Sequence, residues 1–571
     1  MSASYDVAII GAGHNGLVAA GYLSRAGCRV VVLEARPVVG GACVSEELIP
    51  GSKWSSCAFV RGLLRDEIVA ELDLEKHGLE TFAPDVQGFA LFKDGSHLFL
   101  WQDLDRTLKE IERYSKRDAA RFLEFGARFK RFGDLTRQWL LRPPPTLSEV
   151  IRTFEDAGEE DLIDDFLLGS AQDLVSRYFE SEHIKGFLTF FGIVSVWGGP
   201  STPGTGYVYG HHASGEYRGN FGQWAYVKGG MGGITQAMAR SAEAHGAEIR
   251  VSSAVDRVIV KDGTACGVRL RSGEEIQAEV IISNADPKRS LLKFIEAKEL
   301  DAEFRGKVDR IDQRGSMARI HLLVDELPQY LGFPTPGPGP QHRGHQMLGA
   351  SVENFERAWE AQRRGELAEE YAIEAIVQSV LDPSLAPQGQ HTLTLGVQQL
   401  PIDLASGTWD TRREAWADNV VETLCRYAPN LKNHILKRAI ITPLDLEREY
   451  NLTGGNIFQS AMTLNQLFGA RPIREISDYR TPIANYYLCG AGMHPGGGVM
   501  GAPGHNAALT VIGDLKGETE PGDELPKAKK AKQGLVDRIM KTPMGRKLGY
   551  KVARSRMMRP ITALATKTRK D

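Results

Sequence analysis

A glycine-rich turn between a short apolar run and a helix limits what this chain can fold into. Residues 7–10 are apolar, as expected for a strand that is buried on both faces. The sequence Gly11-Ala12-Gly13-His14-Asn15-Gly16 follows directly. In this G-x-G-x-x-G pattern the first glycine permits a tight turn, the second lets the backbone approach a pyrophosphate, and the third lets the next helix pack closely on the strand. The pattern therefore predicts a dinucleotide site.

The following segment completes the motif. We expect a helix over residues 17–25, whose N-terminal amides favour phosphate, and a second strand over residues 29–33. Glu34 ends that strand about 20 residues after the glycines, where an acidic residue accepts hydrogen bonds from a ribose diol. Alone, the glycine pattern is a weak signal, and a fortuitous turn is the alternative; with this context we favour dinucleotide binding.

An extension of the motif indicates which dinucleotide. Arg36 and the pair Gly40-Gly41 lengthen it to E-x-R-x-x-x-G-G. This extension resembles the two-dinucleotide-binding-domain flavoproteins of the glutathione-reductase superfamily, and the resemblance implies FAD. No second G-x-G-x-x-G opens a helix after a strand, so we do not expect a stable NAD(P) site.

Length and composition restrict the class of protein. The chain has 571 residues, 42% hydrophobic and 25% charged, which is typical of a globular protein with two or more cores. Its six cysteines form no C-x-x-C pair and no zinc-type cluster, so we expect isolated thiols in a reducing compartment and no metal site. Because the fold begins by Tyr5 and the longest apolar run, residues 187–197, is too short to span a bilayer, we expect a cytoplasmic protein that is either soluble or peripheral on a membrane surface.

Two later stretches also have the character of a nucleotide fold. Residues 226–233 contain Gly-Gly-Met-Gly-Gly and precede an expected helix, and a strand and a three-stranded meander then end at Ser-Asn-Ala-Asp-Pro, residues 283–287. Residues 486–514 begin as a buried strand, continue through Gly490-Ala491-Gly492 and a His-Pro-Gly-Gly-Gly loop, and should begin a helix at Val499. A helix N-terminus there would stabilise the negative charge that reduced flavin carries near N1 and C2.

We therefore predict an α/β fold whose Rossmann FAD-binding domain, of the glutathione-reductase type, is assembled from residues 1–80, 220–310 and 470–517. Residues 81–219 and 311–469 should form a mixed α+β, partly helical substrate domain. Glycine-rich and aromatic-rich loops between residues 192 and 221 would suit a cavity for a large apolar ligand, and a satellite core is the alternative.

The C-terminal residues 518–571 should form a basic helical tail. From Pro526 onward Lys and Arg alternate with Leu, Ile, Val and Met, and acidic residues are rare. A basic amphipathic segment binds anionic lipid, so we expect contact with a membrane surface; a solvated or subunit-packing tail is the alternative. Nucleic acid is not an expected partner because no nucleic-acid-binding fold accompanies the charge.

The three glycine-rich parts together resemble the phytoene-desaturase-type FAD oxidoreductases. The residues that carry the resemblance are the N-terminal motif, the central Gly-Gly-Met-Gly-Gly and Ser-Asn-Ala-Asp-Pro, and the closing Cys-Gly-Ala-Gly-Met-His-Pro-Gly-Gly-Gly. That group includes carotenoid desaturases and isomerases, retinol saturase and the pyridine nucleotide-disulphide oxidoreductase domain-containing proteins. The helical segments between these parts are less informative.

The resemblance implies which residues contact FAD. The glycine turn and Gly40-Gly41 would hold the pyrophosphate, Glu34 the ribose, and the backbone of Val255 the adenine, while the C-terminal loop would follow the ribityl chain and the ring. The full set of expected FAD-contacting residues is Gly11, Gly13, His14, Asn15, Gly16, Glu34, Ala35, Arg36, Gly40, Gly41, Ala42, Gly230, Met231, Val255, Gly490, Gly492, Gly498, Val499 and Met500.

The resemblance also implies a reaction. Flavin carries the redox chemistry and the protein supplies orientation and electrostatics. We expect hydride transfer between a lipophilic, isoprenoid-like substrate and flavin N5, as in a desaturase, saturase or isomerase, with O2 or a quinone as the electron acceptor. An amine or alcohol oxidase that uses O2, and a flavin-bound interaction scaffold, are the alternatives. The oligomeric state is not determined by the sequence. The candidates for proton transfer are His494, His321, His211 and Tyr207.

Overall fold

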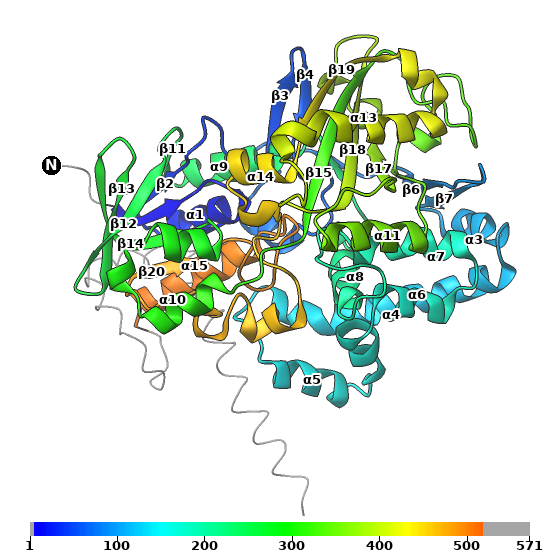
Figure 1. Ribbon diagram of the computed structural model, residues 1–571. Helices are drawn as coiled ribbons and strands as arrows, with labels where there is room; N and C mark the ends of the chain where they lie inside the picture. Colours follow the sequence, from blue (N-terminus) through cyan, green and yellow to red (C-terminus); the bar gives the residue numbers. More distant parts are fainter. Residues whose placement is uncertain (1–4, 518–571) are drawn as a thin grey trace, which may run out of the picture.

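Two seven-stranded sheets organise the residues that the structure, a computed structural model, describes (Figure 1). These are residues 5–517, and the predicted basic tail at 518–571 lies outside them. The first sheet has the order β11-β2-β1-β14-β13-β12, with β20 paired to β14. Its strands are β1 (Tyr5–Ile10), β2 (Val30–Leu33), β11 (Glu248–Arg250), β12 (Val255–Lys261), β13 (Thr264–Leu270), β14 (Glu275–Ser283) and β20 (Tyr486–Leu488).

The first sheet draws on the beginning, middle and end of the described chain. Strands β11, β2, β1, β14 and β20 are parallel to their neighbours, whereas β12, β13 and β14 form an antiparallel meander. All four residues of β2 and the last five of β1 are buried, as expected for parallel strands covered on both faces. Helix α1 (His14–Arg25) packs against α9 (Gly232–Ala244) and α15 (Ala502–Leu515).

The second sheet is antiparallel except where β16 pairs with β6. Its order is β19-β15-β18-β17-β16-β6-β7. Every residue of β15 is buried, because other parts of the chain cover both faces of the sheet there. The strands are β6 (Val86–Leu91), β7 (His97–Trp101), β15 (Ser316–Val324), β16 (His345–Leu348), β17 (Ile373–Ile376), β18 (His391–Leu400) and β19 (Ile435–Ile441). Helices α11 (Val352–Arg363) and α13 (Trp409–Tyr427) flank it.

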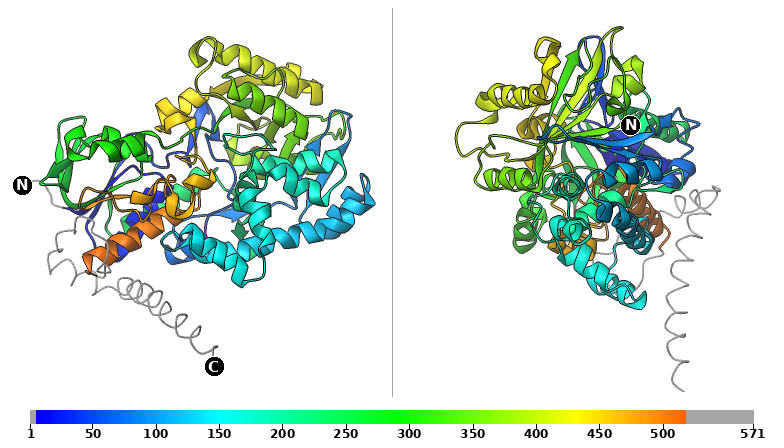
Figure 2. Two further views of the ribbon diagram at one scale, coloured as in Figure 1. Left: turned by 60° about the horizontal axis from the view of Figure 1, so that its bottom comes forward. Right: turned by 90° about the vertical axis from the view of Figure 1, so that its right-hand side faces the viewer.

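A group of helices lies beside the second sheet and away from the meander of the first (Figures 1 and 2). They surround an aromatic core in which Phe132 stacks on Phe166 with 4.2 Å between ring centroids. The members are α3 (Leu104–Glu112), α4 (Lys116–Leu140), α5 (Leu147–Asp156), α6 (Ala171–Tyr178), α7 (Glu182–Thr189) and α8 (Thr205–Ala213).

Backbone conformation sets where helices begin and end in three stretches of the chain. Residues 147–178 are not one helix, since α5 ends before Gly158, whose φ is +65°, and α6 begins with a capping box of Ser170 and Asp173. Residues 63–79 contain only the short α2 (Asp66–Glu71) and turns. The helix expected from Val499 begins at Ala502, because Gly498, Val499 and Gly501 have positive φ. Within residues 5–517 no helix is both long and apolar enough to cross a membrane.

Candidate flavin site

Four polar or glycine-rich segments meet at one edge of the first sheet. The register places Leu33 beside Ile10, Ile10 beside Ser283, and Ser283 beside Leu488 in a single row. The residues that follow these strand ends are Glu34, Gly11, Asn284 and Cys489. Because the strands are parallel, their carboxyl ends share this edge, which is where open α/β sheets bind ligands.

The glycine turn is built for close packing. A Cβ at Gly16 would collide with the carbonyl oxygen of Gly11, so the start of α1 approaches β1 only because residue 16 is glycine. Asn284 lies under the same turn, and its Nδ2 would be 2.7 Å from a Cβ at Gly13. The Ser-Asn-Ala-Asp-Pro sequence is distinctive, but nothing in the sequence alone singles out Asn284 as a part of the site.

The pair Gly40-Gly41 joins this turn directly. The Gly40 amide donates to the Ala12 carbonyl at 2.9 Å, and a Cβ at Gly41 would be 3.3 Å from the Cα of Gly13. Ala42 is then hydrogen-bonded to Ala58, whose amide donates to its carbonyl at 3.1 Å. The predicted pyrophosphate residues from both halves of the N-terminal motif are therefore neighbours.

Glu34 is held by backbone amides at the end of β2. Its carboxylate accepts from the Ala12 amide at 2.8 Å and the Arg36 amide at 2.9 Å, and the side chain is 7% exposed. The Ser253 amide donates to the Glu34 carbonyl at 2.7 Å, which brings the start of β12, at Val255, to the same end of the sheet. Ala35, which is exposed in this turn, follows Glu34 directly. This arrangement suits the predicted ribose and adenine end.

Arg36 packs away from the turn toward a neighbouring cluster. Its guanidinium lies 4.5 Å from the centre of the Tyr450 ring and pairs with Glu46. The hydroxyl of Tyr450 also donates to Glu46 at 3.0 Å. Nη1 of Arg36 is buried and has no hydrogen-bond partner among residues 5–517.

The central glycines lie behind the strands that follow Gly41. The Met231 amide donates to Ser55 at 3.0 Å, and Met231 is fully buried. A Cβ at Gly230 would collide with Ser45. Strands β3 (Ser45–Ile49) and β4 (Ser52–Ser55) are thereby fixed against the start of α9. Contact of Gly230 and Met231 with FAD stays a prediction.

The C-terminal loop approaches the start of α1. A Cβ at Gly504 would collide with the carbonyl oxygen of Asn15, so α15 and α1 begin side by side. Val499 has a φ of +56°, a strained conformation for a β-branched residue, and the next carbonyl, of Met500, accepts from the Arg65 amide at 3.3 Å. Gly498 packs against Leu63. Strain concentrated in the segment predicted to contact the ring is typical of a ligand-holding turn.

Gly490 and Gly492 precede this loop and are held by Gln459. A Cβ at Gly490 would collide with Oε1 of Gln459, and the Gly492 amide donates to the same oxygen at 3.3 Å. A side chain at Gly490 would therefore displace Gln459, and both glycines pack against protein atoms.

A fully buried arginine organises the same loop and was missed from the sequence. Arg471 donates to six backbone carbonyls, of which Ala491 at 2.9 Å and Met493 at 3.2 Å immediately precede the His-Pro-Gly-Gly-Gly sequence. The other acceptors are Phe458, Ser460, Ala461 and Gln466. Burial lowers the pKa of Arg471 to about 10, so it remains charged near neutral pH. No local sequence pattern identifies such a residue.

Three of the four proton-transfer candidates gather around the C-terminal loop. Nε2 of His211 donates to the Gly497 carbonyl at 2.9 Å, and the ring of Tyr207 is 6.3 Å from that of His211. Nε2 of His494 donates to the Trp139 carbonyl at 2.9 Å. Burial lowers the pKa of His211 to about 3 and of His494 to about 4, so both are neutral near pH 7.

His321 lies elsewhere, within the second sheet. It is fully buried on β15, shares a hydrogen bond of 3.1 Å with Thr394, and packs against Trp54 with 5.2 Å between ring centroids. Burial lowers its pKa to about 3. The structure therefore does not group His321 with the other three.

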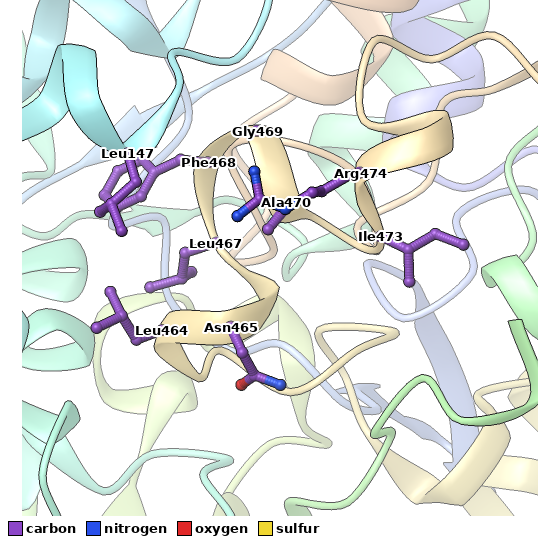
Figure 3. Close-up of a pocket in the computed structure, with 9 residues that line it drawn as sticks. All are labelled: Leu147, Leu464, Asn465, Leu467, Phe468, Gly469, Ala470, Ile473 and Arg474. Carbon is purple, nitrogen blue, oxygen red and sulfur yellow. The ribbon is translucent and has the colours of Figure 1, made fainter. Parts of the chain in front are cut away.

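An apolar pocket of about 650 Å³ lies between Leu147, at the start of α5, and the segment from Leu464 to Arg474 (Figure 3). Leu147, Leu464, Leu467 and Phe468 line one part of it, and Ile473 and Arg474 the other. The Phe468 ring also contacts Tyr207 at 5.4 Å and Trp139 at 6.0 Å between ring centroids. Phe468 is thus shared by the pocket and the aromatic side chains near His211 and His494.

The described residues fit a bound FAD. The first amides of α1 have no acceptor within the helix and point to the glycine turn, where a phosphate would lie. His14, the first residue of α1, has a buried Nε2 with no hydrogen-bond partner in the described part of the chain; the same is true of Oδ1 of Asn15. Burial lowers the pKa of His14 to about 4. Unpaired buried polar atoms at a glycine-lined turn are what a polar ligand would satisfy.

Comparison with known proteins agrees with this geometry. Residues 16–503 match the family described as flavin containing amine oxidoreductase. The chain is 38% identical to pyridine nucleotide-disulfide oxidoreductase domain-containing protein 2 of Rattus norvegicus over 90% of this chain and 94% of the relative. It is 27% identical to a limonene dehydrogenase component of Castellaniella defragrans (89% and 95% covered) and 26% identical to phytoene desaturase (neurosporene-forming) of Cereibacter sphaeroides (90% and 97%).

A solved structure shares the fold. Putrescine oxidase bound to putrescine superposes with a TM-score of 0.55 at 15% identity, over 90% of this chain and 99% of the oxidase. The predicted α/β flavoprotein fold with mixed sheets is therefore confirmed, and so is the predicted resemblance to the phytoene-desaturase branch.

Proposed function

This chain belongs to the flavin containing amine oxidoreductase family, and from that premise we propose that it removes hydride from a lipophilic, isoprenoid-like substrate. Its cofactor is FAD, and it is an FAD-dependent oxidoreductase. The proposal concerns the substrate, because members of this family act on chemically different donors.

The apolar surroundings of the C-terminal loop carry the proposal. A Cβ at Gly496 would be 3.2 Å from Cε of Met462, and Gly497 packs on the Phe458 ring. Leu63 covers Gly498, and Phe468 connects this region to the apolar pocket of Figure 3. We infer that the pocket is the outer end of the substrate path, since burial of apolar substrate surface there is favourable by about 25 cal/mol per Å².

When bound, FAD supplies the two-electron acceptor. Gly11 to Gly16 and Gly40-Gly41 would hold its pyrophosphate, and Glu34 its ribose. The start of α15 would place a partial positive charge beside the ring. Arg471 fixes the loop that leads to α15, and the buried aromatic residues around it exclude water from the reacting atoms.

A test compares donors of different chemistry with the purified holoprotein under anaerobic conditions. We expect limonene, or phytoene in detergent micelles, to bleach the flavin absorbance, and putrescine to leave it unchanged. Bleaching by putrescine alone would make the protein an amine oxidase, the second candidate that the family description and the putrescine oxidase fold support. A flavin that dithionite reduces but none of these donors reduces would favour a flavin-bound scaffold.

The electron acceptor and the basic tail complete the proposed function. We propose that O2 or a quinone reoxidises the flavin, which mixing the reduced protein with each acceptor will distinguish. We also propose that the basic segment after Pro526, outside the described residues, binds an anionic membrane surface. Equal co-sedimentation of the full chain and of a chain that ends at Pro526 with phosphatidylserine vesicles would refute this.

A further inference from the structure

A buried charged network lies in the second sheet, where β15, β17 and β16 each contribute one residue and β18 lies between β15 and β17. Glu374 on β17 accepts from Nη1 of Arg319 on β15 at 2.8 Å, and its other carboxylate oxygen lies 3.0 Å from Nε2 of His345 on β16. Arg319 and Glu374 are 4% exposed and His345 is 2% exposed. Gln398 adds a third contact to Glu374 at 3.2 Å.

The network leaves one ring nitrogen unpaired. An ionised carboxylate only accepts hydrogen bonds, so Nε2 of His345 carries the hydrogen that it donates to Glu374. In the neutral imidazole Nδ1 is then an acceptor, and it is buried without a partner among residues 5–517. Leaving such an acceptor unpaired is unfavourable, because the buried nitrogen gives up its hydrogen bond with water and gains none in return.

Glu374 remains ionised because of its partners. Burial alone would raise its pKa, but Arg319 and then His345 more than offset burial, and the pKa is lowered to about 2. The carboxylate is therefore available to stabilise a positive charge on His345. His212 on α8 is a further titratable group, and it interacts electrostatically with Glu374.

Aromatic rings surround His345. Phe59 stacks parallel to the imidazole at 6.2 Å between ring centroids, Phe190 stacks at 5.7 Å, and Trp224 meets it edge-on at 5.8 Å. Phe191 is 6.3 Å away. Walls of this kind suit a planar or apolar group, with the imidazole as the polar group between them.

The chain connects this site to the flavin site at both ends. Phe59 belongs to the segment between Ala58, which is bonded to Ala42, and Arg65, which is bonded to Met500. Residues 58–65 therefore run from the pyrophosphate glycines to the loop predicted to contact the ring. Trp224 packs against this segment, since its Nε1 would be 3.3 Å from a Cβ at Gly62.

Helix α8 makes the second connection. His211 donates to Gly497 in the C-terminal loop, whereas the next residue, His212, donates through Nδ1 to the Phe191 carbonyl at 3.1 Å. One helical turn thus contacts the flavin loop on one side and the wall of the His345 site on the other.

We propose that His345 is a catalytic proton acceptor of this enzyme, positioned by Glu374 and Arg319, and that the substrate is oxidised between the aromatic walls around it. This rests on the proposed function. A substrate that is dehydrogenated gives up a hydride and a proton. Bound FAD would supply the two-electron acceptor for the hydride, and Nδ1 of His345 takes the proton, which gives an imidazolium opposite the Glu374 carboxylate.

The tautomer of the His345 ring tests the proposal without any substrate that reduces the flavin. In the holoprotein with 15N-labelled histidine, the His345 signals should show a hydrogen on Nε2 and none on Nδ1, and they should disappear in His345→Gln. Protonation of Nδ1 in the resting enzyme would overturn the proposal, because the ring would then have no lone pair to offer.

Chemical rescue separates catalysis from structure. His345→Ala should keep its FAD absorbance per protein, yet its flavin should be reduced by limonene about 100-fold or more slowly, and added imidazole should restore part of the rate and raise the melting temperature. The matched control is His342→Ala: His342 is equally buried, but both ring nitrogens are bonded, to the Gly339 amide and the Pro328 carbonyl. It should lose stability and keep its rate per bound flavin.

The outcomes distinguish the two proposals. Wild-type rates in His345→Ala would overturn the role of His345 and leave the proposed function intact. If no hydrocarbon donor reduces the wild-type flavin, the proposed function fails, and the tautomer measurement still decides whether His345 presents a free acceptor.

Discussion

Glu34 and Glu374 are both buried carboxylates, but the two sheets hold them in different ways. Glu34 accepts hydrogen bonds from the backbone amides of Ala12 and Arg36, which are near it in the chain or in the adjacent turn. Glu374 is held by the side chains of Arg319 and His345, from two other strands of the second sheet, β15 and β16. The first arrangement depends on backbone shape and the second on complementary charges, so different substitutions should damage each.

The largest effect is expected from removing one partner of the charged network. Arg319→Met leaves the Glu374 carboxylate buried without its cation and should lower the free energy of unfolding by about 3–5 kcal/mol. The double variant Arg319→Met/Glu374→Gln should recover much of the loss, because no unpaired charge then remains. Urea unfolding of the two variants and the wild type measures this. A double variant no more stable than Arg319→Met would show that packing, such as the 3.9 Å contact of Arg319 with the Phe59 ring, dominates.

A smaller loss of stability is expected at the flavin site, where the contact between α1 and α15 depends on backbone shape. Gly504→Ala adds a Cβ that collides with the carbonyl oxygen of Asn15, and should cost about 1–3 kcal/mol and reduce bound FAD by separating the starts of α1 and α15. Gly513→Ala in the same helix is the control, since no atom beyond its chain neighbours and its own helix backbone lies within 4 Å of its Cβ position, and it should stabilise by about 0.5–1 kcal/mol. Thermal unfolding and the flavin-to-protein absorbance ratio report both quantities. Equal FAD content in the two variants would contradict this view of the contact.

The smallest expected effect is the contribution of Glu374 to the pH dependence of stability. The pKa of Glu374 is lowered to about 2 in the folded protein, below its unfolded value, so its contribution to stability is complete above the unfolded pKa and decreases as pH falls toward 2. Between pH 7 and pH 5 the wild type and Glu374→Gln should therefore show parallel stabilities, and below pH 4 the wild type should lose stability faster. Melting temperatures across this range give the comparison. Curves that stay parallel to pH 3 would mean that Glu374 does not contribute in this way.

Sequence alone predicted the part of the site that consists of local backbone. A tight glycine turn, an acid at a strand end and a second glycine pair all lie within residues 5–41, and each has a conformational reason visible in its residue type. The resemblance to a flavoprotein branch, and hence FAD, came from these motifs and their counterparts near residues 230 and 490. The family and the cofactor were correct on that basis.

Tertiary structure decided what depends on strand register. Arg319 and Glu374 are 55 positions apart and His345 and Glu374 are 29 apart, and each stands in an ordinary strand sequence with no motif. Only the alignment of β15, β18, β17 and β16 in the second sheet brings them together, and the same sheet holds His321 beside Thr394 rather than with His211 and His494. Local backbone conformation depends on the residue types of a short segment, so the sequence predicts it. Contacts between side chains that are distant in the sequence depend on how the whole chain packs.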